Sequence, residues 1–372
     1  MLDKLLSKCY NFLKRIIFLQ KGRSDIRKLS PDRKKWHDAH SRKLNRQKRK
    51  KRKGDPTRYI PKKYSKNIDR NQIVFSAPSI FSIEKNPDET IEFFNEIVYR
   101  RKAIGARFFI DLAEVTEVTI DALMYLIAVI CDAKSKRVYK QSFRGNMPKN
   151  EDAKKVFINS GFLKYFSHNN IDIIPQSNNV KIIRGQLSDP DIAKQLCDFV
   201  QEKYSYDKIA TRPLYEILVE LMGNTKQHAY EESTYAIGLQ PPKNWYVYAE
   251  EKDNVIGFVF LDTGLGIPAT VARRFRERLP IAGKNHHSAL IVSAMKGEYN
   301  RSQTKMKNRG RGLPQISQCF QDGLFNKAFV FSGKGSCYLN SETQNEYMEQ
   351  PLRAKLFGTL FTWTLMKGAY SK

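Results

Sequence analysis

The sequence predicts an α/β protein that follows a basic, mostly disordered N-terminal tail. The first observation is the charge: residues 1–70 carry 25 Lys and Arg against 6 Asp, a net +19 of the chain's +27. The second is the alternation of apolar strand patterns with amphipathic helix patterns from residue 71 onward, which is typical of an α/β layer. The third is length, because 372 residues are enough for two or three domains that each bury a core.

The tail, residues 1–70, begins with an amphipathic helix pattern. Leu2, Leu5, Cys9 and Leu13 fall at helical spacing, with Lys residues opposite. Such a helix either docks on a protein surface or lies on a membrane surface. It is interrupted by charges and has no small-residue cleavage site, so we expect no signal peptide.

Residues 21–67 are the most basic part of the tail. They contain too little apolar surface to offset the entropy of ordering, so we expect them to be mostly disordered when free. Two interpretations stay open. The segment is a solvated tail, or it binds the phosphates of RNA or DNA, with aromatic side chains to stack on bases. Those aromatic residues are Trp36, Tyr59 and Tyr64.

The spacing of the cysteines and the length of the apolar runs indicate the cellular compartment. The five cysteines lie far apart without a CxxC pair, which argues against a zinc site or a disulfide framework and favours a reducing cytoplasm. No apolar run approaches the roughly 20 residues that span a bilayer, so no transmembrane segment is expected.

Beyond the tail, the pattern predicts two α/β segments. Residues 71–166 read as strand, helix, strand, helix, strand and helix, the last helix covering 151–166. The polar, turn-rich residues 167–179 read as a linker. Residues 180–372 begin a second pattern of one strand, two helices and two strands.

The second helix of that pattern carries a row of polar residues. Glu220, Asn224 and His228 recur every four residues, and each step advances about 40° around a helix, so together they span an arc of about 80°. The adjoining face is apolar: Leu214, Ile217, Leu218 and Leu221. The polar row therefore follows the edge of a buried stripe, where a helix borders a pocket.

Two glycine-containing motifs follow this helix. Asp262-Thr-Gly-Leu-Gly-Ile-Pro268 comes after an apolar strand, so its carboxylate can accept a hydrogen bond from an exocyclic amine while the glycines let the backbone approach a planar ring. Arg309-Gly-Arg-Gly-Leu-Pro314 precedes an apparent helix, and glycines there leave free N–H groups for phosphate.

In this order and on these elements, the motifs resemble those of the GHKL superfamily, the ATP-binding domain of gyrase, MutL, histidine kinases and anti-sigma-factor kinases. The resemblance covers about residues 180–370 and implies a Bergerat-type α/β sandwich that binds ATP and Mg²⁺. It implies that Asn224 coordinates Mg²⁺, that Asp262 reads the adenine amino group, and that Glu220 polarises the attacking water or hydroxyl. The remaining implied nucleotide-site residues are His228, whose role is left open, Gly264, Gly266, Ile267, Gly310, Arg311, Gly312, Leu313 and Thr359.

The same resemblance implies that residues 269–309 form a lid over ATP. The stretch holds 10 Lys and Arg, which either reach the γ-phosphate or line a solvated loop.

Residues 71–166 resemble a STAS domain, the fold of anti-sigma-factor antagonists, through FFIDLAEVTEVTIDALMYLIAV. The phosphorylatable serine of that family is absent, and Thr119-Ile-Asp-Ala122 stands in its place. Asp121 either caps the helix that follows or imitates a permanent phosphate.

Three functions remain open from the sequence. The first is an ATP-dependent conformational switch or ATPase that controls partner binding, with nucleic acid as a candidate partner through residues 21–67. The second is an anti-sigma-type Ser/Thr protein kinase acting on a separate protein. The third is a module that binds ATP without hydrolysing it. A protein partner is expected, and a homodimer is left open.

The tail generates a first prediction. If residues 21–67 bind nucleic acid through phosphates, affinity should fall steeply with salt, with a log–log slope of about −0.9 per neutralised phosphate on duplex DNA. Deleting residues 1–67 should abolish this binding and leave nucleotide affinity unchanged, as measured by fluorescence anisotropy and calorimetry. Binding that is insensitive to salt would contradict the phosphate interpretation.

Overall fold

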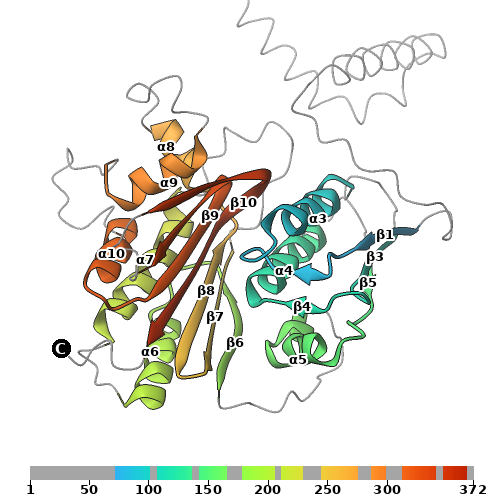
Figure 1. The fold of residues 1–372 in the computed structure, drawn as a ribbon, viewed down its shortest axis with the longest axis horizontal. Coiled ribbons are helices and arrows are strands. Elements are labelled where there is room, and N and C mark those ends of the chain that lie inside the picture. The colour runs from blue at the N-terminus through green and yellow to red at the C-terminus, as the bar shows by residue number, and fades with distance from the viewer. Residues whose placement is uncertain are drawn as a thin grey trace, which may run out of the picture. The chain divides into compact units, whose positions relative to one another are not determined.

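The structure is a computed structural model, and Figure 1 shows its fold. The chain divides into two units, Met1–Ser65 and Lys66–Lys372, and every described residue belongs to the second. The predicted tail, its N-terminal helix and residues 167–177 of the predicted linker therefore lie outside the described residues. The described ranges are 72–100, 107–135, 142–165, 178–205, 211–228, 244–274, 286–298, 312–340 and 347–366.

The predicted α/β class is confirmed, since the described residues contain parallel and antiparallel sheets flanked by helices. Residues 72–165, which we call the N-terminal layer, hold a parallel three-stranded sheet in the order β1-β3-β5. A short parallel pair, β2 and β4, lies beside it. The elements are β1 (Gln72–Ser76), β2 (Ile80–Phe81), α3 (Pro87–Arg100), β3 (Arg107–Asp111), β4 (Glu117–Val118), α4 (Ile120–Ser135), β5 (Ser142–Gly145) and α5 (Glu151–Asn159).

The helix predicted over residues 151–166 is interrupted. Helix α5 ends at Asn159, and a separate 3₁₀ helix, η2, covers Phe162–Tyr165. Between them Gly161 has φ = +80°, a left-handed conformation that glycine adopts without steric cost and that ends a helix. The Ser160 hydroxyl bonds to Phe157 O and Phe162 N, at 3.1 and 3.3 Å, and so closes the turn.

Residues 178–366 form a five-stranded antiparallel sheet in the order β6-β7-β8-β10-β9. Its strands are β6 (Asn179–Gly185), β7 (Trp245–Lys252), β8 (Val255–Asp262), β9 (Lys327–Asn340) and β10 (Met348–Met366). Its helices are α6 (Pro190–Tyr204), α7 (Arg212–His228), α8 (Ile267–Arg274), α9 (His287–Met295) and α10 (Gly312–Gln321). No helix among the described residues is long and apolar enough to cross a membrane.

Helix α9 was not predicted from the sequence, and it lies inside the stretch 269–309 that was assigned to a lid. Leu290, Ile291 and Met295 of this helix are buried in the core. The helix has only nine residues and is apolar on most sides, so it lacks the periodic polar face by which a surface helix is recognised. Residues 275–285 and 299–311 lie outside the described residues.

Both faces of the five-stranded sheet are buried. In β10, Phe361 and Trp363 pack in one core with helices α6, α7, α9 and α10, whereas Leu360 packs in a second core with α3 and α4. Successive side chains of a strand point to opposite faces, so one strand supplies both cores. Figure 1 shows α3 and α4 on the opposite side of the sheet from α6, α7 and α10.

Among the described residues, no strand pairs with one side of β10 before Thr359. Strand β8 ends at Asp262, which pairs with Thr359, so residues 353–357 extend beyond it. Side chains of α3 take the place of that strand: Asp88 accepts from Arg353 N at 3.2 Å, and Asn95 donates to Lys355 O at 3.1 Å. Because the backbone groups of alternate strand residues point to the same side, these contacts follow a two-residue repeat.

A bulge in β10 follows directly. The pairing of β10 with β9 passes from Leu356–Gly333 to Thr359–Ser332, so Phe357 and Gly358 are extra residues on β10. Gly358 has φ = +91°, and a Cβ there would lie 2.0 Å from Asp262 O. The bulge therefore needs glycine for its conformation and for its close approach to β8.

Gly358→Ala should consequently destabilise the protein by at least about 2 kcal/mol, because it combines a strained left-handed residue with a backbone clash. Gly257→Ala is the matched control: it lies on the adjacent strand, and the nearest atom to an added Cβ is Glu250 O at 4.0 Å. Denaturant midpoints measure both. An equal effect of the two substitutions would contradict the close packing of Gly358 on Asp262.

Candidate functional site

Helix α7 carries the polar row predicted from the sequence. Leu214, Ile217, Leu218 and Leu221 are buried, as predicted, and they pack into the core against α6 and the sheet. Glu220 and Asn224 are half-buried at the margin of this stripe. His228 is the last residue of α7, but its side chain lies outside the described residues.

Helix α10, which follows the second glycine motif, lies beside α7. Gln315 of α10 donates to Glu216 of α7 at 2.8 Å, and Glu216 stands one turn before Glu220. Leu313 packs against the core at the start of α10. Gly312 is the first residue of this helix, whereas Gly310 and Arg311 lie outside the described residues. The polar row and the second glycine motif's described residues therefore lie on two neighbouring helices, α7 and α10.

Asp262 ends strand β8 and faces Thr359 of β10 in the sheet register. Its carboxylate accepts the N–H of Gly264 at 2.8 Å and a hydrogen bond from the Thr359 hydroxyl. Thr359 is 3% exposed. Burial raises the pKa of Asp262 to about 6, and these two hydrogen bonds offset part of that rise. The carboxylate is therefore fixed in position and stays the ionised acceptor at neutral pH.

A turn joins Asp262 to helix α8, and we call residues 262–267 the Asp262 turn. Gly266 has φ = +84°, and a Cβ on it would lie 2.6 Å from Ser332 Oγ. Ile267 N donates to the same Ser332 Oγ at 2.9 Å. Ser332 Oγ in turn donates to Gly358 O at 2.8 Å. One buried hydroxyl therefore ties the turn to the β10 bulge.

Ser332 and Gly358 are residues of this region that sequence reasoning missed. Gly358 opens the stretch GTLFTW, directly before Thr359, and a glycine inside an apolar strand pattern is a signal for a bulge. Ser332 carries no such signal, because a serine in a strand is common and its partners are 65 and 26 residues away in the chain.

The predicted site residues thus fall into two groups in the structure. Asp262, Gly264, Gly266, Ile267 and Thr359 gather at the end of β8, where hydrogen bonds and pairing join them. Glu220, Asn224, Gly312 and Leu313 lie on α7 and α10, and α7 packs against β8. In the described part of the chain, no three His, Cys, Asp or Glu side chains gather to hold a metal ion.

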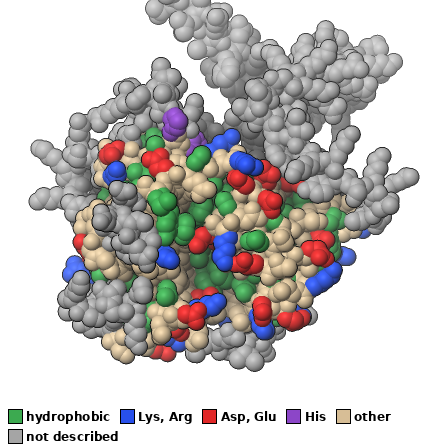
Figure 2. All heavy atoms as spheres, viewed as in Figure 1, with side chains coloured by type: hydrophobic (Ala, Val, Ile, Leu, Met, Phe, Trp, Pro, Cys, Tyr) green, Lys and Arg blue, Asp and Glu red, His purple; other side chains and the backbone are tan. Residues whose placement is uncertain are grey.

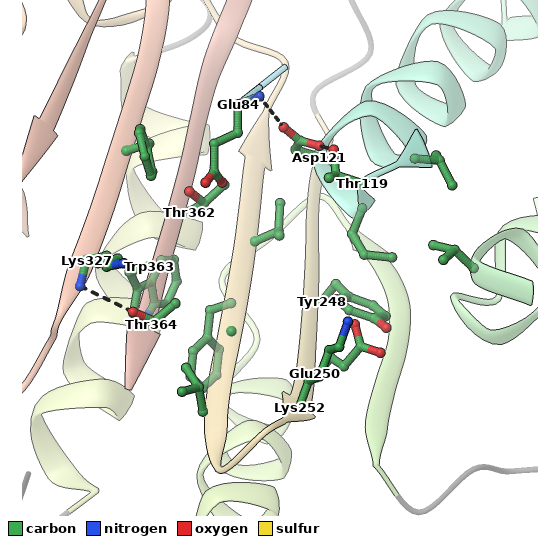
Figure 3. A pocket seen from close by; sticks show the side chains of 18 residues that line it. Glu84, Thr119, Asp121, Tyr248, Glu250, Lys252, Lys327, Thr362, Trp363 and Thr364 are labelled. Carbon is green, nitrogen blue, oxygen red and sulfur yellow. Dashed lines mark hydrogen bonds between the residues drawn. The ribbon is translucent and has the colours of Figure 1, made fainter. Parts of the chain in front are cut away.

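A pocket of about 400 Å³ lies elsewhere, on the sheet face that carries the N-terminal layer. Figure 3 shows Glu84 and Asp121 on one wall and Tyr248 with Glu250 on another. On the face shown in Figure 2, apolar side chains surround a hollow in which charged side chains also lie. Burial and the neighbouring Asp121 raise the pKa of Glu84 to about 7. None of the predicted site residues within the described ranges lines this pocket.

Asp121 is buried in the first turn of α4 and has a wider structural role than helix capping. Its carboxylate accepts the backbone N–H groups of Glu84 and Ala122, at 2.8 and 2.7 Å, and the Thr119 hydroxyl. Burial raises the pKa of this carboxyl despite these bonds. Asp121 therefore fastens the segment before α3 to the start of α4.

Comparison with models of protein families found no family that matches this chain. Comparison with curated proteins found no match either.

Proposed function

We propose that residues 180–370 form a GHKL-type domain that binds Mg²⁺ and ATP, and that the chain is an ATP-dependent conformational switch with ATPase activity that controls the binding of a partner. Residues 71–166 would be its STAS-like part. The alternation β1-α3-β3-α4-β5-α5 with parallel strands supports this second assignment, and the partner remains a protein or a nucleic acid.

The observation that carries the proposal is the arrangement around Asp262. A half-buried carboxylate is held by Gly264 N–H and the Thr359 hydroxyl, and no side chain beyond Cα stands on Gly264 or Gly266 beside it. A carboxylate held in this way can accept the exocyclic amine of adenine. Gly264 carries no side chain that would obstruct the flat ring, whereas the space beside Gly266 is filled by Ser332 Oγ. Guanine presents a carbonyl oxygen where adenine presents the amine, so the same carboxylate would repel it.

The phosphate end of the site would lie between α7 and α10. The start of α10 offers backbone N–H groups and the positive end of a helix dipole. Magnesium in nucleotide sites is held by phosphates, water and one or two protein oxygens, and the half-buried amide of Asn224 is suited to that share of the coordination. The Mg²⁺–ATP complex would supply an activated phosphoryl group.

Glu220 is one turn before Asn224 on the same helix and half-buried. We assign it the role of orienting and deprotonating the attacking water, because a carboxylate next to the γ-phosphate is a suitable general base. A protein kinase would use the same carboxylate on a protein hydroxyl. A module that only binds ATP would not need it.

One prediction concerns recognition of the adenine base by Asp262. Asp262→Asn should weaken ATP binding by about 1.5–3 kcal/mol, the scale of a hydrogen bond to a charged group, and GTP should bind poorly to the wild type. Titration calorimetry measures both. Equal affinity of the wild type for ATP and GTP would contradict the adenine assignment.

The pH dependence follows from the raised pKa of Asp262, about 6. The carboxylate is ionised above that pH and protonated below it, so ATP affinity of the wild type should fall as pH drops through about 6. The phosphates of ATP also titrate, and Asp262→Asn provides the control because it keeps that contribution and loses the carboxylate. If the ATP affinities of the wild type and of Asp262→Asn change in parallel with pH, Asp262 does not contact adenine.

A further prediction distinguishes nucleotide binding from nucleotide hydrolysis. Asn224→Ala should lose the Mg²⁺-dependent part of nucleotide affinity, whereas Glu220→Ala should still bind Mg²⁺–ATP and hydrolyse it about 10²–10⁴-fold more slowly. Glu202→Ala, an exposed glutamate on α6, is the control for loss of a carboxylate. Phosphate release and γ-label transfer are measured with and without added protein.

Label that moves only to an added protein would support the kinase instead. Nucleotide binding without phosphate release or label transfer would support a binding module. Unchanged hydrolysis by Glu220→Ala would remove that residue from the mechanism.

A further inference from the structure

We propose that Tyr125, on helix α4 of the N-terminal layer, is a positioning residue for the adenine end of the nucleotide site. The inference depends on the function proposed above and extends it, because it names a residue far from the motifs that controls the shape of that site. It also gives the contact between the N-terminal layer and strand β10 a role in the site.

Tyr125 contacts β10 at the peptide groups of Phe357. This residue lies in the β10 bulge, outside the register with β9 and before the pairing with β8 begins at Thr359. The Phe357 residue is 43% exposed, but the hydrogen bonds of its peptide groups are part-buried, and peptide groups withdrawn from water without a partner are costly. The phenol of Tyr125 meets both groups: it accepts Phe357 N–H at 2.8 Å and donates to Phe357 O at 3.1 Å. One hydroxyl thus replaces a missing strand partner.

Tyr125 can act as a fixed point because its ring cannot move freely. It is 4% exposed, and its ring centroid lies 4.7 Å from that of Phe94 on α3. Its neighbours on α4 are buried throughout the middle of the helix. The position of Phe357 is therefore set by the core of the N-terminal layer.

From Phe357 the contacts lead directly to the Asp262 turn. Gly358 packs so closely that an added Cβ would lie 2.0 Å from Asp262 O and 3.1 Å from Thr263 Cα. Its carbonyl accepts from Ser332 Oγ, which also accepts from Ile267 N. A shift of Phe357 would move Gly358, and both the turn and the adjacent Thr359 would have to follow.

Two residues of α3 also bond to β10, at positions that precede the bulge. Asp88 bonds to Arg353 N and pairs with the Arg353 side chain at 3.3 Å, and Asn95 donates to Lys355 O. They hold the segment before the bulge. Among the described contacts of this series, the Tyr125 contact is the one adjacent to Gly358, so its loss should affect the site most.

The test compares two substitutions that each remove one buried hydroxyl. Tyr125→Phe removes both bonds to Phe357. Tyr204→Phe is the matched control, because the buried Tyr204 hydroxyl likewise lies within hydrogen-bond distance of two backbone groups. It shares its single proton between Asn254 O at 2.8 Å and Leu365 O at 3.0 Å. Leu365 lies near the C-terminal end of β10, whereas the bulge lies near the middle of the strand. A purely structural role for Tyr125 predicts the same behaviour for both variants.

Two measurements are made on the full chain. Calorimetry with ATP should show about ten-fold weaker binding for Tyr125→Phe, the scale expected for two lost hydrogen bonds, and unchanged binding for Tyr204→Phe. Hydrogen exchange should become faster at the amides of Phe357 and Ile267 in Tyr125→Phe only. Equal changes in both variants, or none in Tyr125→Phe, would overturn the inference.

The two measurements also separate this inference from the proposed function. If the wild type binds no adenine nucleotide, the proposed function fails, and with it the role of Tyr125 in nucleotide binding. Faster exchange confined to Tyr125→Phe together with unchanged ATP affinity would overturn the inference alone, since Tyr125 would then hold the turn without influencing the site.

Discussion

Phe357 and Gly358 form the bulge of β10 directly before its pairing with β8, and the way their backbone is held determines much of the structure around them. Tyr125 satisfies the peptide groups of Phe357, and Ser332 satisfies the carbonyl of Gly358. Gly358 then packs against the end of β8, where Asp262 begins its turn. A local irregularity in one strand thus joins the N-terminal layer, the sheet and the candidate site.

The burial of both sheet faces explains why such a junction is needed. An antiparallel sheet commonly leaves one face in water, but here α3 and α4 cover the face opposite α6, α7 and α10. A strand between two cores cannot shift toward one without disturbing the other, because protein interiors are close-packed. Movement of α3 and α4 relative to the sheet would therefore displace residues 353–359.

This arrangement is suited to a nucleotide-dependent switch. Coupling between two sites requires an element whose position both sites influence, and the coupling is reciprocal. The β10 bulge is such an element in the proposed function, with α4 on one side and the Asp262 turn on the other. The pocket of about 400 Å³ beside Glu84 and Asp121 lies on the same face as α4, and none of the residues proposed to bind the nucleotide lines it within the described ranges.

Local patterns in the sequence were sufficient for the fold class and for most elements. The buried stripe of α7, the strand that ends at Asp262 and the helix after the second glycine motif are all encoded within a few residues, as helix or strand periodicity. The polar row of Glu220 and Asn224 follows from the same period. The family resemblance placed Asp262 and Thr359 in one nucleotide site, but their pairing in the sheet was not predicted, since 97 positions of sequence separate them.

Tertiary structure alone decided the rest. Helix α9 has no polar face to mark it, the break at Gly161 needed a left-handed glycine, and Ser332 acquires its role from partners on α8 and β10. Tyr125 looks like one more apolar residue of a buried helix, yet its hydroxyl meets a peptide 232 residues away. Sequence periodicity records which face of an element is buried, whereas the partner of a buried hydroxyl depends on how distant elements pack.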